Sequence, residues 1–383
     1  MAISVLFIDI EGGWGGSSRS LYYLVKYLEK KRCRPVILMG KHGPIKEKYE
    51  NDKIGTFLFT PIPRTTAMQD KNIKGTLLFL FQLIYLPGIL SLIKKIKKQY
   101  SVEIIHLNHE SLFFLGFCIK VLFRTKLVYH VRTMIPKNFM SRIQVFTAIS
   151  TADHLIYITE NEKKRWNAIY PKSKKAKQTI IYNIAESVDG RYPSSRLNTV
   201  INKFKVISLM TVSYRRGTDR MVDVAYFLNK RNMQDIVFIV CGKTEGICEI
   251  EMRERIEQKG LGEFFLFLGH QDKPEEVLKE CDILIRPSRE YNPWGRDIIE
   301  ALTLGKPVIA IGNYDKFIED GINGYLLPEF NIEEIAEKII YLAGHPEVTA
   351  TMKKANTKKA KRLFDGTTNA AKVAAIYDSL IKS

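Results

Sequence analysis

The sequence predicts an α/β protein built from two Rossmann-like domains with mostly parallel sheets. Short apolar strand patterns alternate with amphipathic helix patterns along the chain, which is typical of parallel sheets. A strand, turn and helix pattern opens the chain and begins again near Lys205. The length of 383 residues is sufficient for two such domains, each with a full core.

The first half opens with an apolar strand pattern over residues 3–10 and a glycine-rich turn. The turn holds Gly12, Gly13, Gly15 and Gly16. A helix is predicted to begin near Ser17 or Ser18, since both residue types cap helices well. Unobstructed amides at a helix N-terminus form an anion site, although close packing of helix against strand explains the glycines equally well.

The segment 75–98 is almost long and apolar enough to span a bilayer. Gln82 and the Pro87-Gly88 pair interrupt it, and four lysines close it. We expect a buried or amphipathic helix that leads to the strand pattern 102–108. A spanning helix and a helix lying on a membrane surface remain alternatives.

Two strand patterns, beginning at Val102 and Lys126, each lead into a polar loop. The candidate polar residues at their ends are His106, His109, Glu110, His130 and Arg132. Zinc is one interpretation, but the spacing is poor and no cysteine joins them. Histidines packed in the core are the alternative.

In the second half, residues 281–312 read as strand, polar loop, helix and strand. The loop 289–297 would lie outside the carboxyl end of its strand, where ligands bind in parallel sheets. Glu300 is predicted on the first turn of the following helix, from which its carboxylate reaches back to bind paired ribose hydroxyls. A solvated loop capped by Asp297, with Glu300 favouring the helix dipole, is the alternative.

The charge distribution indicates the kind of binding partner, and the cysteines indicate the cellular compartment. Residues 1–190 hold 30 Lys+Arg and 14 Asp+Glu, a difference of +16, whereas the remainder holds 29 and 27, a difference of +2. A basic half suggests an anionic partner, although a lysine-rich solubilising surface explains it too. Five dispersed cysteines and the lack of a basic leader before the first strand favour reduced thiols in a cytosol.

Residues 281–312 resemble the donor-binding segment of the retaining nucleotide-sugar glycosyltransferases of family 4 (group 1), which have the GT-B fold. Trp294-Gly295 matches their aromatic-Gly pair and Glu300 their second glutamate, while Asn292 stands where the first glutamate is expected. The resemblance implies two Rossmann-like domains facing across a cleft. The expected boundaries are 1–188 for the acceptor-side domain, 189–362 for the donor domain, and 363–383 for a helix crossing back to the first domain.

The resemblance also implies roles for particular residues. In the donor domain, the residues implied to bind the nucleotide sugar are Arg215, Arg216, Lys243, Leu268, Trp294, Gly295, Arg296 and Glu300. Arg216-Gly217 takes the place of a Lys-Gly pair on the diphosphate, while the family's upstream arginine is missing. From the first domain, Gly15, Gly16 and Ser17 are implied to close the phosphate site. His130 or Arg132, together with Asn292, is implied to act near the reacting sugar.

The expected function is retaining transfer of a hexose-type sugar from a UDP- or GDP-sugar to a glycan or lipid-linked acceptor in cell-surface polysaccharide assembly. No Asp-x-Asp motif is evident near the donor segment, so neither metal nor cofactor is expected. A cytoplasmic location, peripheral on an anionic inner membrane face, is expected. A GT-B epimerase or phosphorylase and a nonenzymatic nucleotide-sugar-binding protein are the alternatives. Nucleic-acid binding is not expected, because it rests on the basic first half alone.

Overall fold

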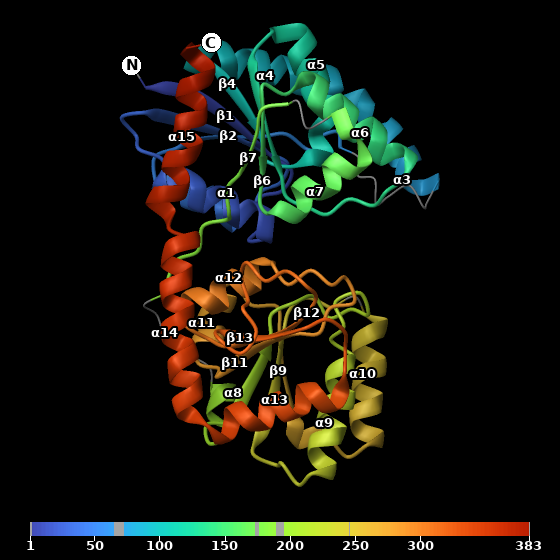
Figure 1. Cartoon of the computed structure of the whole chain (residues 1–383). Coiled ribbons are helices and arrows are strands. Elements are labelled where there is room, and N and C mark those ends of the chain that lie inside the picture. Colours follow the sequence, from blue (N-terminus) through green and yellow to red (C-terminus); the bar gives the residue numbers. More distant parts are fainter. Residues whose placement is uncertain (1, 65–72, 173–175, 189–194, 245, 383) are drawn as a thin grey trace. The chain divides into compact units, whose positions relative to one another are not determined.

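The computed structural model describes residues 2–64, 73–172, 176–188, 195–244 and 246–382, and the side chains of residues 73–76 are outside this description (Figure 1). It divides into two compact units. Unit 1 comprises Met1–Ile184 and Gly366–Ser383, and unit 2 comprises Ala185–Asp365. The sequence had placed these boundaries after residues 188 and 362. Each unit holds one parallel sheet, which confirms the predicted fold class.

Unit 1 is built around a seven-stranded sheet with the order β3-β2-β1-β4-β5-β6-β7. Its strands are β1 (Ile3–Asp9), β2 (Cys33–Met39), β3 (Gly55–Leu58), β4 (Ile104–Leu107), β5 (Lys126–Val131), β6 (His154–Tyr157) and β7 (Gln178–Ile180). All seven residues of β1 are buried, because helices cover both faces of the sheet. The continuous apolar strand patterns of the sequence follow from this burial.

Two separate apolar cores lie on the two faces of the unit 1 sheet. The α-helices are α1 (Gly16–Tyr27), α2 (Pro44–Asn51), α3 (Ile73–Gln82), α4 (Leu86–Tyr100), α5 (Phe113–Phe123), α6 (Phe139–Thr151), α7 (Glu160–Ile169) and α15 (Gly366–Lys382), with short 3₁₀ helices η2 (Leu83–Tyr85) and η3 (Glu110–Leu112). α1 and α15 bury apolar residues on one face, and α4 to α7 do so on the other. Alternate residues of β1, such as Leu6 and Phe7, enter the two cores.

The apolar segment that the sequence predicted as a helix extends over α3, η2 and α4. By length and composition alone, Leu77–Tyr100 could cross a membrane. However, Ile89, Ile93 and Ile96 of α4 are fully buried in the core of unit 1. Strands β3 and β4, which precede and follow the segment, belong to the same sheet. The segment therefore connects two strands of the same sheet.

Unit 2 is built around a six-stranded parallel sheet with the order β10-β9-β8-β11-β12-β13. Its strands are β8 (Phe204–Ser208), β9 (Ile236–Cys241), β10 (Phe265–Gly269), β11 (Ile283–Arg286), β12 (Val308–Ile311) and β13 (Gly324–Leu327). Its helices are α8 (Ser195–Asn198), α9 (Arg220–Lys230), α10 (Ile247–Gln258), η5 (Gly262–Phe264), α11 (Pro274–Lys279), α12 (Arg296–Thr303), α13 (Ile332–Gly344) and α14 (Pro346–Leu363). The strand order reverses between β8 and β11, and ligands of open parallel sheets bind at such a reversal, beside the carboxyl ends of the strands.

Helix α12 corrects one detail of the sequence prediction. It begins at Arg296, two residues before the predicted start, so Glu300 lies on its second turn and not on its first. Gly305, with φ of +73°, lies just after the helix, in the left-handed conformation that commonly ends helices. Gly295, in extended conformation, is the residue that precedes the first helical turn.

Candidate functional site

The loops after β8 and β11 lie side by side at the point where the unit 2 sheet reverses its strand order. Arg289 of the second loop donates two hydrogen bonds, each of 2.7 Å, to the carboxylate of Asp219. Its backbone amide also donates to the carbonyl of Arg215 at 3.2 Å. A bidentate arginine–carboxylate pair fixes geometry well, so the two loops are held in a defined relation.

Glu290 brings three predicted site residues together. Arg215 Nη1 lies 2.5 Å from its Oε1, and Arg216 Nη1 lies 2.7 Å from its Oε2. The amide of Asn292 donates to the same Oε2 at 3.1 Å. Burial, with Arg286 nearby, lowers the pKa of Arg216. Its contact with both arginines follows from the folding of the two loops, which lie about 75 residues apart in the sequence.

Arg286 is a buried cation that the sequence reading did not include among the candidate residues. It forms an ion pair with Asp297, and its Nη2 donates to Oδ1 of Asn292 at 3.0 Å. A Cβ at Gly295 would lie 2.4 Å from Arg286 Nη1, so a larger residue there would displace the Arg286 side chain from Asp297. Asp297 is therefore a buried partner of Arg286 and not a solvated cap. A charged residue at the end of an apolar strand pattern was the available signal.

Glu300 is buried on α12, with 4% of its surface exposed. Arg296 Nε donates to its Oε1 at 2.6 Å, so these two predicted residues form a pair one helical turn apart. Trp294 packs edge-on against Tyr314, with ring centroids 5.4 Å apart. The loop and the start of α12 thus hold Asn292, Trp294, Gly295, Arg296 and Glu300 as one connected group.

Lys243 follows β9, and Leu268 lies near the end of the neighbouring strand β10. Lys243 is exposed, and its carbonyl accepts a hydrogen bond of 2.7 Å from the amide of Val212 in the loop after β8. Leu268 is buried, and its carbonyl accepts a hydrogen bond of 2.7 Å from the side chain of Gln271. Both residues lie at the same sheet edge as the arginines.

In unit 1, the glycine-rich turn after β1 leads into α1, which begins at Gly16, just before the two predicted serines, and has no side-chain cap. Gly15 immediately precedes the helix, and Gly15 and Gly16 are exposed. A Cβ at either glycine would meet nothing within 4 Å, so internal packing does not require these two glycines. The carbonyl of Ser17 accepts a 3.3 Å hydrogen bond from Asn108, which also donates to Asp9 at 2.9 Å.

Arg132 joins the loops after β4, β5 and β7. Its Nε donates to Oδ1 of Asn108 at 2.8 Å, and its Nη1 donates to Oδ1 of Asn183 at 2.7 Å. Its Nη2 lies 3.3 Å from Nδ1 of His130. Burial, together with Arg132 and His106, lowers the pKa of His130 well below its ordinary value, so its imidazole is neutral. The structure therefore brings the two predicted residues His130 and Arg132 into direct contact.

The other polar candidates of unit 1 serve the fold in this structure. His106 is fully buried, and its Nδ1 lies 2.6 Å from the hydroxyl of Tyr377 on α15. His109 caps η3 by accepting a hydrogen bond from the amide of Ser111. Glu110 accepts a 2.9 Å hydrogen bond from the amide of Arg132. Within the described residues, no group of three or more His, Cys, Asp or Glu side chains is arranged to hold a metal ion.

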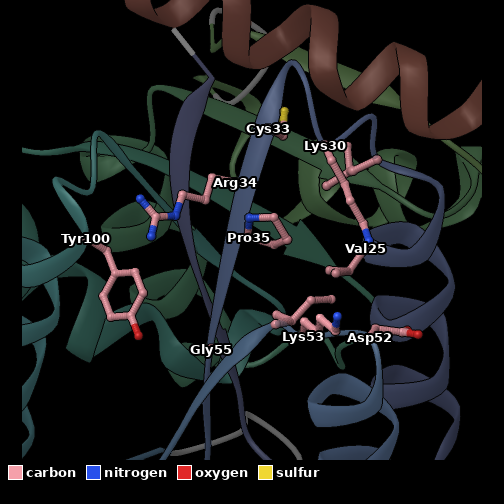
Figure 2. Close-up of a pocket in the computed structure, with 11 residues that line it drawn as sticks. Val25, Lys30, Cys33, Arg34, Pro35, Asp52, Lys53, Gly55 and Tyr100 are labelled. Carbon is pink, nitrogen blue, oxygen red and sulfur yellow. The ribbon is translucent and has the colours of Figure 1, made fainter.

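A cavity of about 560 Å³ lies elsewhere in unit 1, at the amino ends of β2 and β3 (Figure 2). Cys33 and Gly55, which begin these strands, line it, and the guanidinium of Arg34 lies 5.4 Å from the ring centre of Tyr100 at its wall. Ligands of parallel sheets bind at the carboxyl ends of strands. This cavity lies at the opposite edge, and none of the predicted site residues lines it.

Two family models match the chain, one in each half. Residues 14–186 match Glycosyltransferase Family 4, and residues 195–359 match Glycosyl transferases group 1. The second match contains the loops after β8 and β11 and helix α12. Together the two models cover most of both units.

The chain is similar to several curated and structurally characterised proteins. It is 30% identical over 136 residues to the poly(ribitol-phosphate) alpha-N-acetylglucosaminyltransferase of Staphylococcus aureus, covering 34% of this chain and 27% of the relative. It is 23% identical over 203 residues to the poly(glycerol-phosphate) alpha-glucosyltransferase of Bacillus subtilis, covering 52% of this chain and 29% of the relative. The chain thus spans less than a third of the length of either relative.

Among solved structures, Anabaena HepE in complex with UDP-glucose matches with a TM-score of 0.78 at 22% identity, covering 98% of this chain and 100% of that chain. This likeness concerns the fold. With the two parallel sheets, it confirms the GT-B class predicted from the sequence.

Proposed function

Because the chain belongs to the family-4 (group 1) glycosyltransferases, we propose that it transfers a hexose-type sugar from a nucleotide-diphosphate sugar to a glycan or lipid-linked acceptor, with retention of anomeric configuration. One observation carries the proposal: three arginines, Arg215, Arg216 and Arg286, gather where the unit 2 sheet reverses its order. Glu300 lies on the helix that follows the same loop.

The proposed chemistry is stabilisation of a departing nucleoside diphosphate. As the anomeric bond breaks, negative charge grows on the diphosphate, and fixed cations stabilise that charge strongly in a partly buried site. Arg215 and Arg216 would supply the cations. The carboxylate of Glu300 would accept hydrogen bonds from the ribose hydroxyls, and Asn292, oriented by Arg286, would contact the sugar. The absence of an Asp-x-Asp motif near the donor segment supports transfer without a metal or other cofactor.

The donor and the acceptor are proposed from relatives. UDP is favoured over GDP because HepE binds UDP-glucose, and a cell-surface polysaccharide acceptor is favoured because both curated relatives are named for poly(polyol-phosphate) substrates. We also propose a cytoplasmic location at the inner face of the membrane. The five cysteines, all within the described residues, form no disulfide, which supports a reducing compartment.

The test combines donor binding with turnover. A panel of UDP- and GDP-sugars is screened by thermal shift, and the stabilising donor is then incubated with a polyol-phosphate acceptor in the presence and absence of EDTA. We expect nucleotide release that requires the acceptor, is unaffected by EDTA, and gives a product whose anomeric proton coupling matches that of the donor. An isomerised sugar without an acceptor would indicate an epimerase, and binding without turnover or hydrolysis a binding protein.

Glu300→Gln provides the site test, because the glutamine amide keeps the size of the side chain and a hydrogen bond to Arg296. Losing the carboxylate should lower kcat/KM about a hundredfold, as expected for one transition-state contact of about 3 kcal/mol. Glu257→Gln, on the exposed face of α10, is the matched control and should leave kcat/KM unchanged. Equal activity in both variants would contradict the assigned role of Glu300.

A further inference from the structure

Neighbouring helices of unit 1 expose large apolar side chains to solvent. These side chains are Leu77, Leu78, Leu80 and Phe81 on α3, Ile84 on η2, Phe117, Val121 and Leu122 on α5, and Phe139, Ile143 and Phe146 on α6. We call this set the apolar surface. Phe139 is 77% exposed and Ile84 63%. Scattered exposed apolar residues are ordinary, but a group on adjacent elements marks an interaction site.

The helices that carry the apolar surface are in contact with one another. The rings of Phe79 on α3 and Phe114 on α5 lie 5.7 Å apart. The side chain of Gln144 on α6 donates a 3.0 Å hydrogen bond to the carbonyl of Glu110, just before α5. Figure 1 shows α3, α5 and α6 grouped on one flank of unit 1. The exposed residues therefore belong to one region of unit 1.

Helix α6 shows that the exposure follows a helical face. Phe139, Arg142, Ile143 and Phe146 are exposed at the spacing i, i+3, i+4 and i+7, whereas Val145 and Ala148 on the same helix are buried. The helix thus has one apolar face in the core and a second one outside. The fold itself requires only the first of these faces.

The charged side chains on the helices of the apolar surface all have the same sign. Residues 71–102 and 111–152, which include α3, α4, α5 and α6, contain no aspartate or glutamate. Among the described residues, the exposed cations of these segments are Lys94, Lys95 and Lys98 on α4, Arg124 at the end of α5, Lys137 before α6, and Arg142 on α6. An apolar area on helices that carry only positive charge complements a layer of anionic headgroups over hydrocarbon.

We propose that the apolar surface docks this protein on a bilayer that contains anionic phospholipids. Its phenylalanines, leucines and isoleucines would enter the headgroup boundary, while the lysines and arginines would contact lipid phosphates. The buried isoleucines of α4 hold the 77–100 segment on the sheet, so docking requires insertion of exposed side chains and no spanning helix. The proposal rests on the membrane location proposed above and identifies the residues that would produce it.

Vesicle flotation of the full chain tests the proposal. Wild type is mixed with vesicles of phosphatidylcholine alone, and with vesicles of equal parts phosphatidylcholine and phosphatidylglycerol. We expect wild type to float with the anionic vesicles and to detach as salt rises, because salt screens the charge contribution. The triple variant Phe139→Ser/Ile143→Ser/Phe146→Ser should bind at least about tenfold less, since three inserted apolar side chains are lost.

Two controls make the result specific. Ile247→Ser/Ile250→Ser removes two residues that are 59% and 54% exposed on α10, a helix rich in glutamate, and should float like wild type. Circular dichroism melting of the triple variant should match wild type, because its substituted side chains are already exposed.

The charge-reversal variant Arg124→Glu/Arg142→Glu should weaken binding to anionic vesicles specifically.

Three results would overturn the proposal: no flotation of wild type, equal flotation of the triple variant, or a wild-type dimer in sedimentation that the triple variant converts to monomer without any vesicle binding. The last result would make the apolar surface an interface between copies. Donor binding, measured as UDP affinity, should be unchanged in the triple variant. Wild type that floats but binds no nucleotide sugar would refute the proposed function while leaving membrane docking supported.

Discussion

At the scale of single residues, the interactions of Glu290 determine how the arginine group of unit 2 is arranged. Its two carboxylate oxygens accept from Arg215 and Arg216, the residues expected to hold a diphosphate. A carboxylate and a phosphate compete for the same guanidinium donors. Donor binding at these arginines would therefore have to displace Glu290 or share the arginines with it.

Replacing Glu290 with glutamine should tighten nucleotide binding. Partly exposed ion pairs are worth up to about 1 kcal/mol, so removing this competing charge should lower the Kd for UDP about fivefold. Isothermal titration calorimetry measures the change. Arg216→Gln serves as the opposite control, because it should weaken UDP binding. A weaker UDP affinity in Glu290→Gln would show that Glu290 positions the arginines for the ligand and does not compete with it.

Sequence patterns identified some residues of the site and missed others. Glu300, Trp294 and Gly295 were identified from one short motif, since the motif lies on one loop and helix. Arg286 was missed because its partners, Asp297 and Asn292, are defined by the fold of that loop. Its position at the end of an apolar strand was a signal, because charged residues are rarely buried unless they are paired.

At the scale of elements, helix α4 shows why an apolar segment need not span a membrane. The length and composition of Leu77–Tyr100, which ends with α4, allow a spanning helix, but one face of α4, Ile89, Ile93 and Ile96, is fully buried in unit 1. On the rest of the helix surface, Lys94, Lys95 and Lys98 are exposed. Helical periodicity therefore places the isoleucines in the core and the lysines in solvent.

Substitution of a core isoleucine on this segment should destabilise the protein strongly. Ile93→Ala should lower the free energy of unfolding by about 2–5 kcal/mol, because it leaves a cavity in the core. Ile84→Ala, at a residue 63% exposed on the preceding turn, should change it by less than about 0.5 kcal/mol. Urea unfolding of both variants measures the difference. Equal, small effects would imply that α4 is not part of the folded core.

At the scale of the whole molecule, the chain begins and ends in unit 1. Helix α15 contributes Val373, Ala374 and Tyr377 to the core that contains α1 and β1. The hydroxyl of Tyr377 meets the buried imidazole of His106, which joins residues 271 positions apart. The folding of unit 1 therefore depends on the last segment of the chain.

This buried contact makes the stability of unit 1 depend on pH. Burial lowers the pKa of His106 from 6.5 to about 3, so between these values the unfolded chain binds a proton that the folded chain does not. Stability is therefore lost as pH falls below 6.5. From pH 7 to pH 5, His106 should account for a loss of about 2 kcal/mol.

Urea unfolding of wild type and His106→Gln at both pH values measures this contribution. Both proteins carry Trp294→Phe, so that the remaining tryptophans, Trp14 and Trp166, report by fluorescence on unit 1, which contains them. The difference in stability between pH 7 and pH 5 should be smaller in the variant by about the same 2 kcal/mol. The comparison isolates His106, because His130, whose lowered pKa acts in the same direction, and Asp9, whose raised pKa acts in the opposite one, are present in both proteins. An identical pH dependence in both proteins would contradict a neutral, buried His106.

The sequence by itself determined the two-part parallel α/β fold, the strand–turn–helix starts of both units, and the local donor motif around Glu300. These features depend on periodicity and on residues close together in the chain. Only the tertiary structure decided that Glu290 pairs with Arg215 and Arg216, that Arg132 meets Asn108 and Asn183, and that exposed apolar residues of α3, α5 and α6 share one flank. Such contacts join residues that lie far apart in sequence, and they follow from strand order, which local patterns do not encode.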